Sequence, residues 1–197
     1  MIRRADSRAR APEAREQRGE ALAAAEIEKT MFSQEEIQLR VSELAREINE
    51  DYGTEGVLMV GILKGAFIFL ADLARHITVP VRFDFMACSS YGSSMKTSGV
   101  VRILKDLDTD IKDMNVIIVE DIIDTGLTLS YLRKNLASRG PASLEICSLL
   151  NKKQVEGKVD LPIKYEGFSI PDIFVVGYGL DYDQQYRNLP YIATLKK

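Results

Sequence analysis

The chain has 197 residues and a formal net charge of −3, with 46% hydrophobic and 28% charged residues. A chain of this size forms one domain with a sizeable core, and its slightly acidic balance excludes a strong basic field for nucleic acid. No apolar run approaches the roughly 20 residues that a membrane span needs, and the N-terminus lacks an apolar signal core. We therefore expect a cytoplasmic enzyme or binding protein.

Residues 1–30 have the composition of an extension. They are rich in Arg, Ala and Glu, and they contain no aromatic residue. An organelle transit peptide would be poor in acids, whereas acids balance the arginines here. We expect a disordered or helical extension with no catalytic or binding role, followed by one domain over residues 31–197.

The first part of that domain predicts a helix followed by a βαβ unit. Residues 33–36, Ser-Gln-Glu-Glu, form a capping box, and apolar residues then recur at helical spacing. Residues 57–60 are a short apolar run typical of a buried strand, residues 66–77 predict a helix, and residues 81–87 predict the next strand. A right-handed crossover is expected between the two strands.

Histidine and cysteine offer little chemistry. His76 is the only histidine, which excludes a histidine-dependent triad and any two-histidine metal site. Its position predicts a place near a helix C-terminus. Cys88 and Cys147 both fall in strand-like runs and are expected to be buried free thiols.

The stretch 116–128, VIIVEDIIDTGLT, is the chemical centre of the chain. Its four branched apolar residues predict a strand buried on both faces of a parallel sheet. Two acids, Glu120 and Asp121, follow where that strand ends. A helix is predicted over residues 129–136 and a further buried strand over 144–150, which completes a second βαβ unit.

The turn at 124–128 suits a phosphomonoester. It offers successive backbone N–H groups, two hydroxyls and a helix N-terminus. Neither G-x-x-x-x-G-K-[ST] nor G-x-G-x-x-G occurs in the chain, which disfavours a kinase or a dinucleotide enzyme. Glu120 and Asp121 suit hydroxyl groups and hydrated Mg²⁺ instead. A phosphate at one end and a diol at the other indicate a sugar phosphate.

Other segments are ambiguous from the residues alone. Lys64-Gly65 could offer a cation and N–H groups to an anion, or could be a solvated turn. Residues 88–99 are small and polar, and could form a flexible hairpin loop or a lid over substrate, with a return strand over 100–104. Residues 173–182 predict a strand in a small β-rich cover. We expect the core at about residues 50–160 and this hood from about 161 to 197, together with the N-terminal part.

The central stretch resembles the phosphoribosyl pyrophosphate (PRPP) signature of the type I phosphoribosyltransferases. The segments GILKGAFIFLADL, SSYGSSMKTSG and PDIFVVGYGLDYDQQYRNLPYI extend the resemblance over roughly residues 32–195, toward the bacterial hypoxanthine-guanine branch. The resemblance implies an α/β fold, with a parallel sheet flanked by helices and a small β-rich hood.

The resemblance also implies roles at the PRPP end of the site. Glu120 and Asp121 would hold the ribose hydroxyls and Mg²⁺, and Asp181 would bind a second Mg²⁺. Lys64, Gly65 and Arg187 would contact pyrophosphate. The 5′-phosphate would lie in the turn made by Asp124, Thr125, Gly126, Leu127 and Thr128.

At the base end, Asp124 would be the catalytic acid or base opposite purine N7. Lys152 would donate to the 6-oxo group, Phe174 would stack on the base, and the Val175 backbone would meet its other edge. Ser90 and Tyr91 would lie in the lid.

The implied activity is purine salvage: hypoxanthine or guanine reacts with PRPP to give IMP or GMP and pyrophosphate, with Mg²⁺ as cofactor. The partners would be small molecules, without nucleic acid or membrane, in a homodimer or homotetramer. Two alternatives stay open, a PRPP-binding regulatory protein with the same fold and a xanthine-preferring enzyme.

Overall fold

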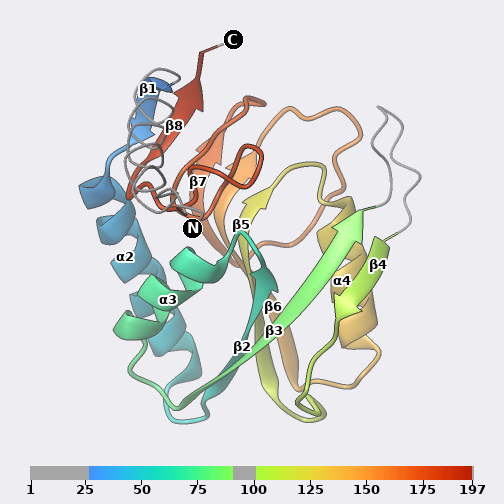
Figure 1. Cartoon of the computed structure of the whole chain (residues 1–197). Coiled ribbons are helices and arrows are strands. Elements are labelled where there is room, and N and C mark those ends of the chain that lie inside the picture. Colours follow the sequence, from blue (N-terminus) through green and yellow to red (C-terminus); the bar gives the residue numbers. More distant parts are fainter. Residues whose placement is uncertain (1–26, 91–100, 197) are drawn as a thin grey trace, which may run out of the picture.

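The computed structural model describes residues 27–90 and 101–196. They form a six-stranded sheet of order β4-β3-β2-β5-β6-β7 and a separate two-stranded sheet of β1 and β8. All neighbours in the large sheet are parallel except β3 and β4. Figure 1 shows α2 and α3 on one face of this sheet and α4 on the other. The elements are β1 (Ile27–Phe32), α2 (Gln34–Tyr52), β2 (Val57–Leu63), α3 (Phe67–His76), β3 (Val81–Ser90), β4 (Val101–Lys105), β5 (Asn115–Ile123), α4 (Leu127–Ala137), β6 (Ser143–Lys152), β7 (Tyr165–Ile170) and β8 (Ile192–Leu195).

The predicted capping box starts α2. The Glu36 backbone N–H donates to Ser33 Oγ at 3.2 Å, and the Ser33 N–H donates to a Glu36 carboxylate oxygen at 2.8 Å. Both bonds satisfy N–H groups that have no partner within the helix. Gly53 ends the helix at φ 50°, a backbone conformation that favours glycine.

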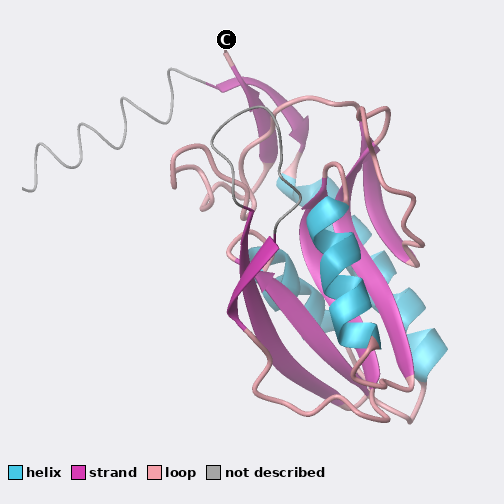
Figure 2. Cartoon of the chain, turned by 90° about the vertical axis from the view of Figure 1, so that its right-hand side faces the viewer, coloured by secondary structure: helices cyan, strands magenta, loops and turns pink. Residues whose placement is uncertain are grey.

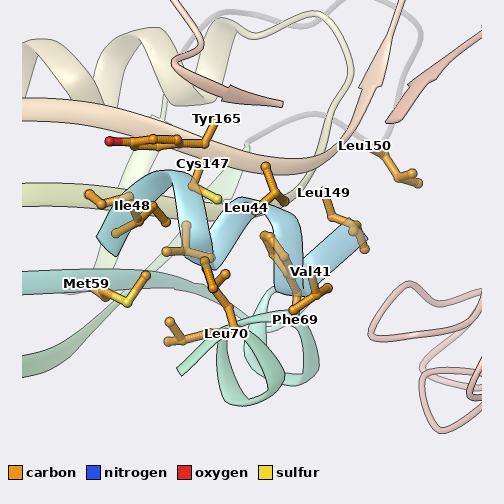
Figure 3. Close-up of a cluster of buried hydrophobic side chains, with 14 of the residues drawn as sticks. Val41, Leu44, Ile48, Met59, Phe69, Leu70, Cys147, Leu149, Leu150 and Tyr165 are labelled. Carbon is orange, nitrogen blue, oxygen red and sulfur yellow. The ribbon is translucent and has the colours of Figure 1, made fainter. Parts of the chain in front are cut away.

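Side chains along the central strands point alternately to the two faces of the sheet, and this divides the hydrophobic core into two layers. On β5, Ile117 and Val119 join the cluster under α2 and α3, whereas Val116 and Ile118 join the cluster under α4. A strand covered on both faces must be apolar at every position, which explains the unbroken apolar run. Figure 3 shows the first cluster, in which α2 side chains such as Leu44 pack over the sheet.

The order of the strands places a crevice between β2 and β5. The chain passes from β2 through α3 to β3 on one side, and from β5 through α4 to β6 on the other. Both predicted βαβ units are confirmed as parallel neighbours. Ligands of open α/β sheets bind where the strand order reverses, at the carboxyl ends of the strands. The loops after β2 and β5 meet there.

The two-stranded sheet lies at the end toward which the parallel strands point, as Figures 1 and 2 show. The Phe32 ring stacks on Phe168 with centroids 4.1 Å apart, which joins β1 to β7. The Tyr178 hydroxyl donates to Asp72 Oδ2 on α3 at 2.7 Å. These contacts anchor the hood over the sheet edge.

Three boundaries differ from the expectations. Residues 27–30, assigned to the extension, pair with β8 and form most of β1. Cys88 and Ser89, assigned to the polar connection, still pair with β4, so that connection starts later. The large sheet extends past residue 160, because β7 pairs in parallel with β6 and buries Tyr165.

The predicted strand over 173–182 is wrong. The segment makes only isolated bridges, including Val176 with Ala193. Gly177, Tyr178 and Gly179 have φ values of 99°, 51° and 101°, which an extended strand cannot accommodate. The chain therefore coils over the sheet edge.

Both cysteines are free, as predicted, with Cys147 buried and Cys88 partly buried. His76 lies in the last turn of α3, also as predicted. Within residues 27–90 and 101–196, no helix has the length and apolar character to cross a membrane.

Candidate active site

The turn between β5 and α4 opens a cavity at the carboxyl edge of the sheet. Gly126 precedes α4 with a φ of 77° and has no side chain with which to cap the helix. A Cβ atom on it would also lie 3.0 Å from the Leu161 side chain. The Leu127 N–H makes only a long hydrogen bond of 3.5 Å to Thr125 Oγ1, so the N–H groups of the first helical turn can serve a ligand. The cavity measures about 280 Å³, and its polar lining comes from Glu120, Asp121, Asp124, Thr125, Gly126 and Thr128.

The adjacent acids at the end of β5 are buried side by side, which disfavours their charged forms. Burial, and after it the charge of Asp121, raise the pKa of Glu120 well above its usual range. Burial also raises the pKa of Asp121, although hydrogen bonds from Glu120 and the Ile122 N–H oppose that rise. Hydroxyl donors or a divalent cation would remove this penalty.

The loop after β2 packs directly on those acids. The peptide bond between Leu63 and Lys64 is cis. A Cβ atom on Gly65 would lie 1.7 Å from Asp121 Oδ2, so only glycine fits there. On the other side of the loop, a Cβ atom on Gly179 would lie 2.1 Å from the Gly65 carbonyl oxygen. Asp121, the loop and the hood thus form three tightly stacked layers.

Hood residues surround the same loop. Lys64 Nζ donates to Gln184 Oε1 at 3.1 Å. Arg187 forms an ion pair with Asp181 at 2.6 Å, and it donates to the Gly179 carbonyl oxygen at 2.6 Å. The other Asp181 oxygen accepts the Gln184 backbone N–H at 2.8 Å. Asp181 and Arg187 therefore lie together, as expected of groups that share a ligand.

A second cavity lies beside the first. It measures about 250 Å³ and is lined by Asp124, Lys152, Phe174 and Val175, among others. Both cavities share Asp121, Ile122 and Asp124. The site therefore has two chambers that meet at Asp124.

Lys152 ends β6 and points its ammonium group between two carboxylates. Its Nζ lies 3.4 Å from Asp124 Oδ1 and 3.0 Å from Asp172 Oδ1. Its side chain is 11% exposed, so these ion pairs are held in a partly dry place. Sequence reasoning missed Asp172. Its place two residues before Phe174, directly after Pro171, is the signal that could have found it.

The aromatic wall of the second chamber is open. Phe174 is 55% exposed, and its ring makes an edge contact with Tyr182 at 5.9 Å between centroids. Val175, in contrast, is buried. A large apolar ring left this exposed beside a polar cavity is available for stacking on a planar ligand.

Two site predictions lie at or beyond the limits of the described residues. Ser90 is the last residue of β3, but its side chain is outside the described part, and Tyr91 is wholly outside it. Leu127 begins α4 and is 38% exposed, and its backbone N–H donates to Thr125 Oγ1 in the turn at 3.5 Å.

The composition of the site fits a loosely held Mg²⁺ ion. No group of three or more His, Cys, Asp or Glu residues gathers closely enough to hold a metal within the described ranges. Mg²⁺ usually binds through one or two carboxylates, several waters and the phosphates of the substrate. Glu120 and Asp121 supply such a pair, whereas both Asp181 oxygens already have partners that a cation would have to displace.

Comparison with known proteins agrees with this geometry. Residues 29–183 match the model of the phosphoribosyl transferase domain. The chain belongs to the phosphoribosyltransferase family. It is 53% identical over 176 residues to the hypoxanthine-guanine phosphoribosyltransferase of Mycobacterium avium, covering 86% of each chain. It is 52% identical over 167 residues to the hypoxanthine phosphoribosyltransferase of Escherichia coli, covering 84% of this chain and 93% of the relative.

Solved structures of the family agree as well. A hypoxanthine phosphoribosyltransferase from Staphylococcus aureus has a TM-score of 0.83 at 45% identity, over 86% of this chain and 92% of that one. A hypoxanthine-guanine phosphoribosyltransferase from Bacillus anthracis has a TM-score of 0.81 at 46% identity, over 87% and 99%. The predicted phosphoribosyltransferase fold is thereby confirmed, with its helix-flanked sheet and separate antiparallel sheet.

Proposed function

We propose that this phosphoribosyltransferase salvages 6-oxopurines: it joins hypoxanthine or guanine to PRPP and releases IMP or GMP and pyrophosphate. The observation that carries the proposal is the pair of chambers that share Asp121 and Asp124. One chamber has the chemistry for a sugar phosphate, and the other has a cation and an open aromatic face. Their junction is where a bond between sugar and base would form.

At the phosphate end, the turn from Asp124 to Thr128 binds the 5′-phosphate through backbone N–H groups and two hydroxyls. Glu120 and Asp121 accept hydrogen bonds from the ribose hydroxyls, which stabilises the charged forms that burial disfavours. On the other side of Asp121, the loop at Lys64 and Gly65 meets the pyrophosphate, together with Arg187.

At the base end, Lys152 and Asp124 recognise two neighbouring atoms of one purine edge. The Lys152 ammonium can only donate, so it favours a 6-oxo group over a 6-amino group. The Asp124 carboxylate, 3.4 Å from that ammonium, is positioned for the adjacent N7–H. Phe174 stacks on the ring, and the Val175 backbone meets the opposite edge. The chemistry of these groups selects an oxopurine.

During transfer, the bond from the anomeric carbon to pyrophosphate breaks with its electron pair leaving on oxygen, and the purine nitrogen forms the new bond. The ribosyl centre becomes electron-poor, and the carboxylates of the site offset its positive charge. Asp124 accepts the N7 proton as the new bond forms, so that no positive charge remains on the base. Mg²⁺, held by Glu120, Asp121 and Asp181 together with substrate, would neutralise the departing pyrophosphate.

A substrate panel tests the proposal. Purified protein with PRPP and Mg²⁺ is offered hypoxanthine, guanine, xanthine, adenine and uracil in parallel, and nucleotide formation is followed by absorbance. We expect turnover of the first two and very little of adenine or uracil, since neither presents an oxo group beside an N7–H. Preference for xanthine would select that alternative. PRPP binding without turnover of any base would select the regulatory protein.

We further propose that the enzyme works in the cytoplasm as a homodimer or homotetramer. The two free thiols, Cys88 and Cys147, support the location, because a reducing compartment keeps cysteines unpaired. Large apolar side chains exposed outside the site, such as Leu39 on α2 at 63% and Phe67 on α3 at 45%, support association. Light scattering of the purified protein gives the oligomeric mass, and a monomer would refute this part.

A further inference from the structure

A third cavity is lined by the end of β6 and by the connection between β6 and β7. It measures about 410 Å³, and its lining includes Asn151, Lys153, Lys158 and Glu166. Lys158 comes from the connection between β6 and β7, which the substrate roles above do not use. Its side chain reaches back to the end of β6, the strand that ends in Lys152.

The Lys158 ammonium group binds the backbone of Lys152, the residue proposed to recognise the base. Its Nζ donates to the Lys152 carbonyl oxygen and to Asn151 Oδ1. Asn151 is only 2% exposed, and its amide nitrogen donates to Glu166 Oε2 at 2.7 Å. The amide is therefore fixed at both ends, and it presents its oxygen to Lys158.

The anchor of this network is an ionised carboxylate. Burial would raise the pKa of Glu166, but hydrogen bonds from Ser169, Asn151 and Lys153 outweigh burial and leave the pKa lowered. A charged Glu166 accepts strong hydrogen bonds and keeps the Asn151 amide from turning. The orientation of the Asn151 oxygen toward Lys158 follows from this.

The residues that follow Lys158 contact the turn at 124–128, the proposed binding site of the 5′-phosphate. The Val159 backbone N–H donates to the Thr125 carbonyl oxygen at 2.8 Å. The Leu161 side chain occupies the space next to Gly126, where a Cβ atom would meet it at 3.0 Å. One short segment thus contacts the backbone of the phosphate turn and, through Lys158, the backbone of Lys152.

Burial and the nearby Lys153 charge lower the pKa of Lys158, while Glu166 and Asp124 act in the opposite direction. A lysine that only covered the surface would stay in water. Here the Lys158 ammonium group is partly withdrawn from water, and it donates hydrogen bonds to Asn151 Oδ1 and the Lys152 carbonyl oxygen at the end of β6.

We propose that Lys158 is a positioning residue, which fixes the Lys152 backbone relative to the Thr125–Gly126 turn and so sets the spacing between the base and phosphate chambers. The proposal rests on the proposed function, because the two chambers must be occupied by parts of one reaction. Lys158 does not touch substrate in this scheme. It acts through the two backbone segments that it and its neighbours hold.

The test compares Lys158→Met with Lys164→Met in the full chain. Lys164 lies in the same connection between β6 and β7, its side chain is 41% exposed, and it pairs with Asp51 on α2 at 2.9 Å, away from both chambers. The measurements are kcat, KM for hypoxanthine, KM for PRPP and thermal unfolding. For Lys158→Met we expect both KM values to rise, the hypoxanthine value by roughly tenfold or more, while the unpaired Asn151 oxygen lowers the melting temperature by about a few degrees.

Rescue separates positioning from general stability. Lys158→Arg keeps a cation and its donors, so it should recover most of the lost affinity, whereas Lys158→Gln keeps a donor without charge and should recover only part. Lys164→Met should match the unaltered protein in both KM values. The proposal is overturned if Lys158→Met has unchanged KM values, or if Lys164→Met shows equal losses. Absence of purine turnover in the unaltered protein would instead refute the proposed function, and calorimetric titration with IMP would then test whether Lys158→Met still alters binding.

Discussion

Replacement of Gly65 by alanine should disable the site while the fold persists. The added Cβ atom would lie 1.7 Å from Asp121 Oδ2 and 2.4 Å from its Cγ, whereas ordinary contacts begin at 3.4 Å. The loop cannot retreat, because the Gly179 backbone packs against the Gly65 carbonyl oxygen on the other side. Either Asp121 rotates away from the ribose position or the pyrophosphate loop shifts.

Both responses move a binding group by more than an ångström. Overpacking of this kind costs roughly 1–3 kcal/mol of stability. Misplacement of about 1 Å can reduce the rate of an enzyme by about 100-fold. We therefore expect kcat/KM for PRPP to fall by about 100-fold, with a moderate loss in the free energy of unfolding.

The assay is steady-state conversion of hypoxanthine to IMP, with urea unfolding measured on the same samples. Gly140→Ala is the matched control, because Gly140 has a φ of +72° and an added Cβ would meet nothing closer than 4.0 Å. It suffers backbone strain of about 1–2 kcal/mol but no collision, so its activity should stay close to normal. Full activity of Gly65→Ala, or an equal loss in Gly140→Ala, would refute the reasoning.

Three further substitutions test other parts of the site. Asp124→Ala should lower kcat by about 10²–10⁴-fold with PRPP binding by calorimetry largely kept, and unchanged turnover would remove its acid–base role. Glu120 has a raised pKa, so the folded chain holds a proton that the unfolded chain releases, and stability falls as pH rises from the unfolded to the native pKa. Glu120→Gln should therefore stabilise the unliganded protein at pH 7 while weakening PRPP binding; a lower melting temperature would contradict this. Tyr178→Phe removes the hydrogen bond to Asp72 and should cost about 1 kcal/mol in urea unfolding, whereas no change would mean that this contact does not hold the hood.

Local sequence patterns determined several helices and strands of this protein. The capping box started α2 where expected, and the unbroken apolar run at 116–119 required a strand covered on both faces. Because parallel strands all end at one sheet edge, the order of elements alone brought Glu120, Asp121 and Lys152 to the same side. The predicted family follows from the same stretches and is confirmed.

Other features depended on contacts between distant segments. The apolar run at 173–176 has strand composition, but the positive φ angles that follow it turn the chain over the sheet edge. Asp172 gained its place beside Lys152 from that path, and no local signal marked Lys158 as a contact of the β6 end.

The central stretch shows the division most clearly. Its sequence determined that two acids and a phosphate-binding turn would end a buried strand, because composition and spacing decide local structure. Only the tertiary structure decided that Gly65 lies against Asp121 and that two chambers meet at Asp124. Those distances depend on how loops far apart in the chain pack, which periodicity cannot encode.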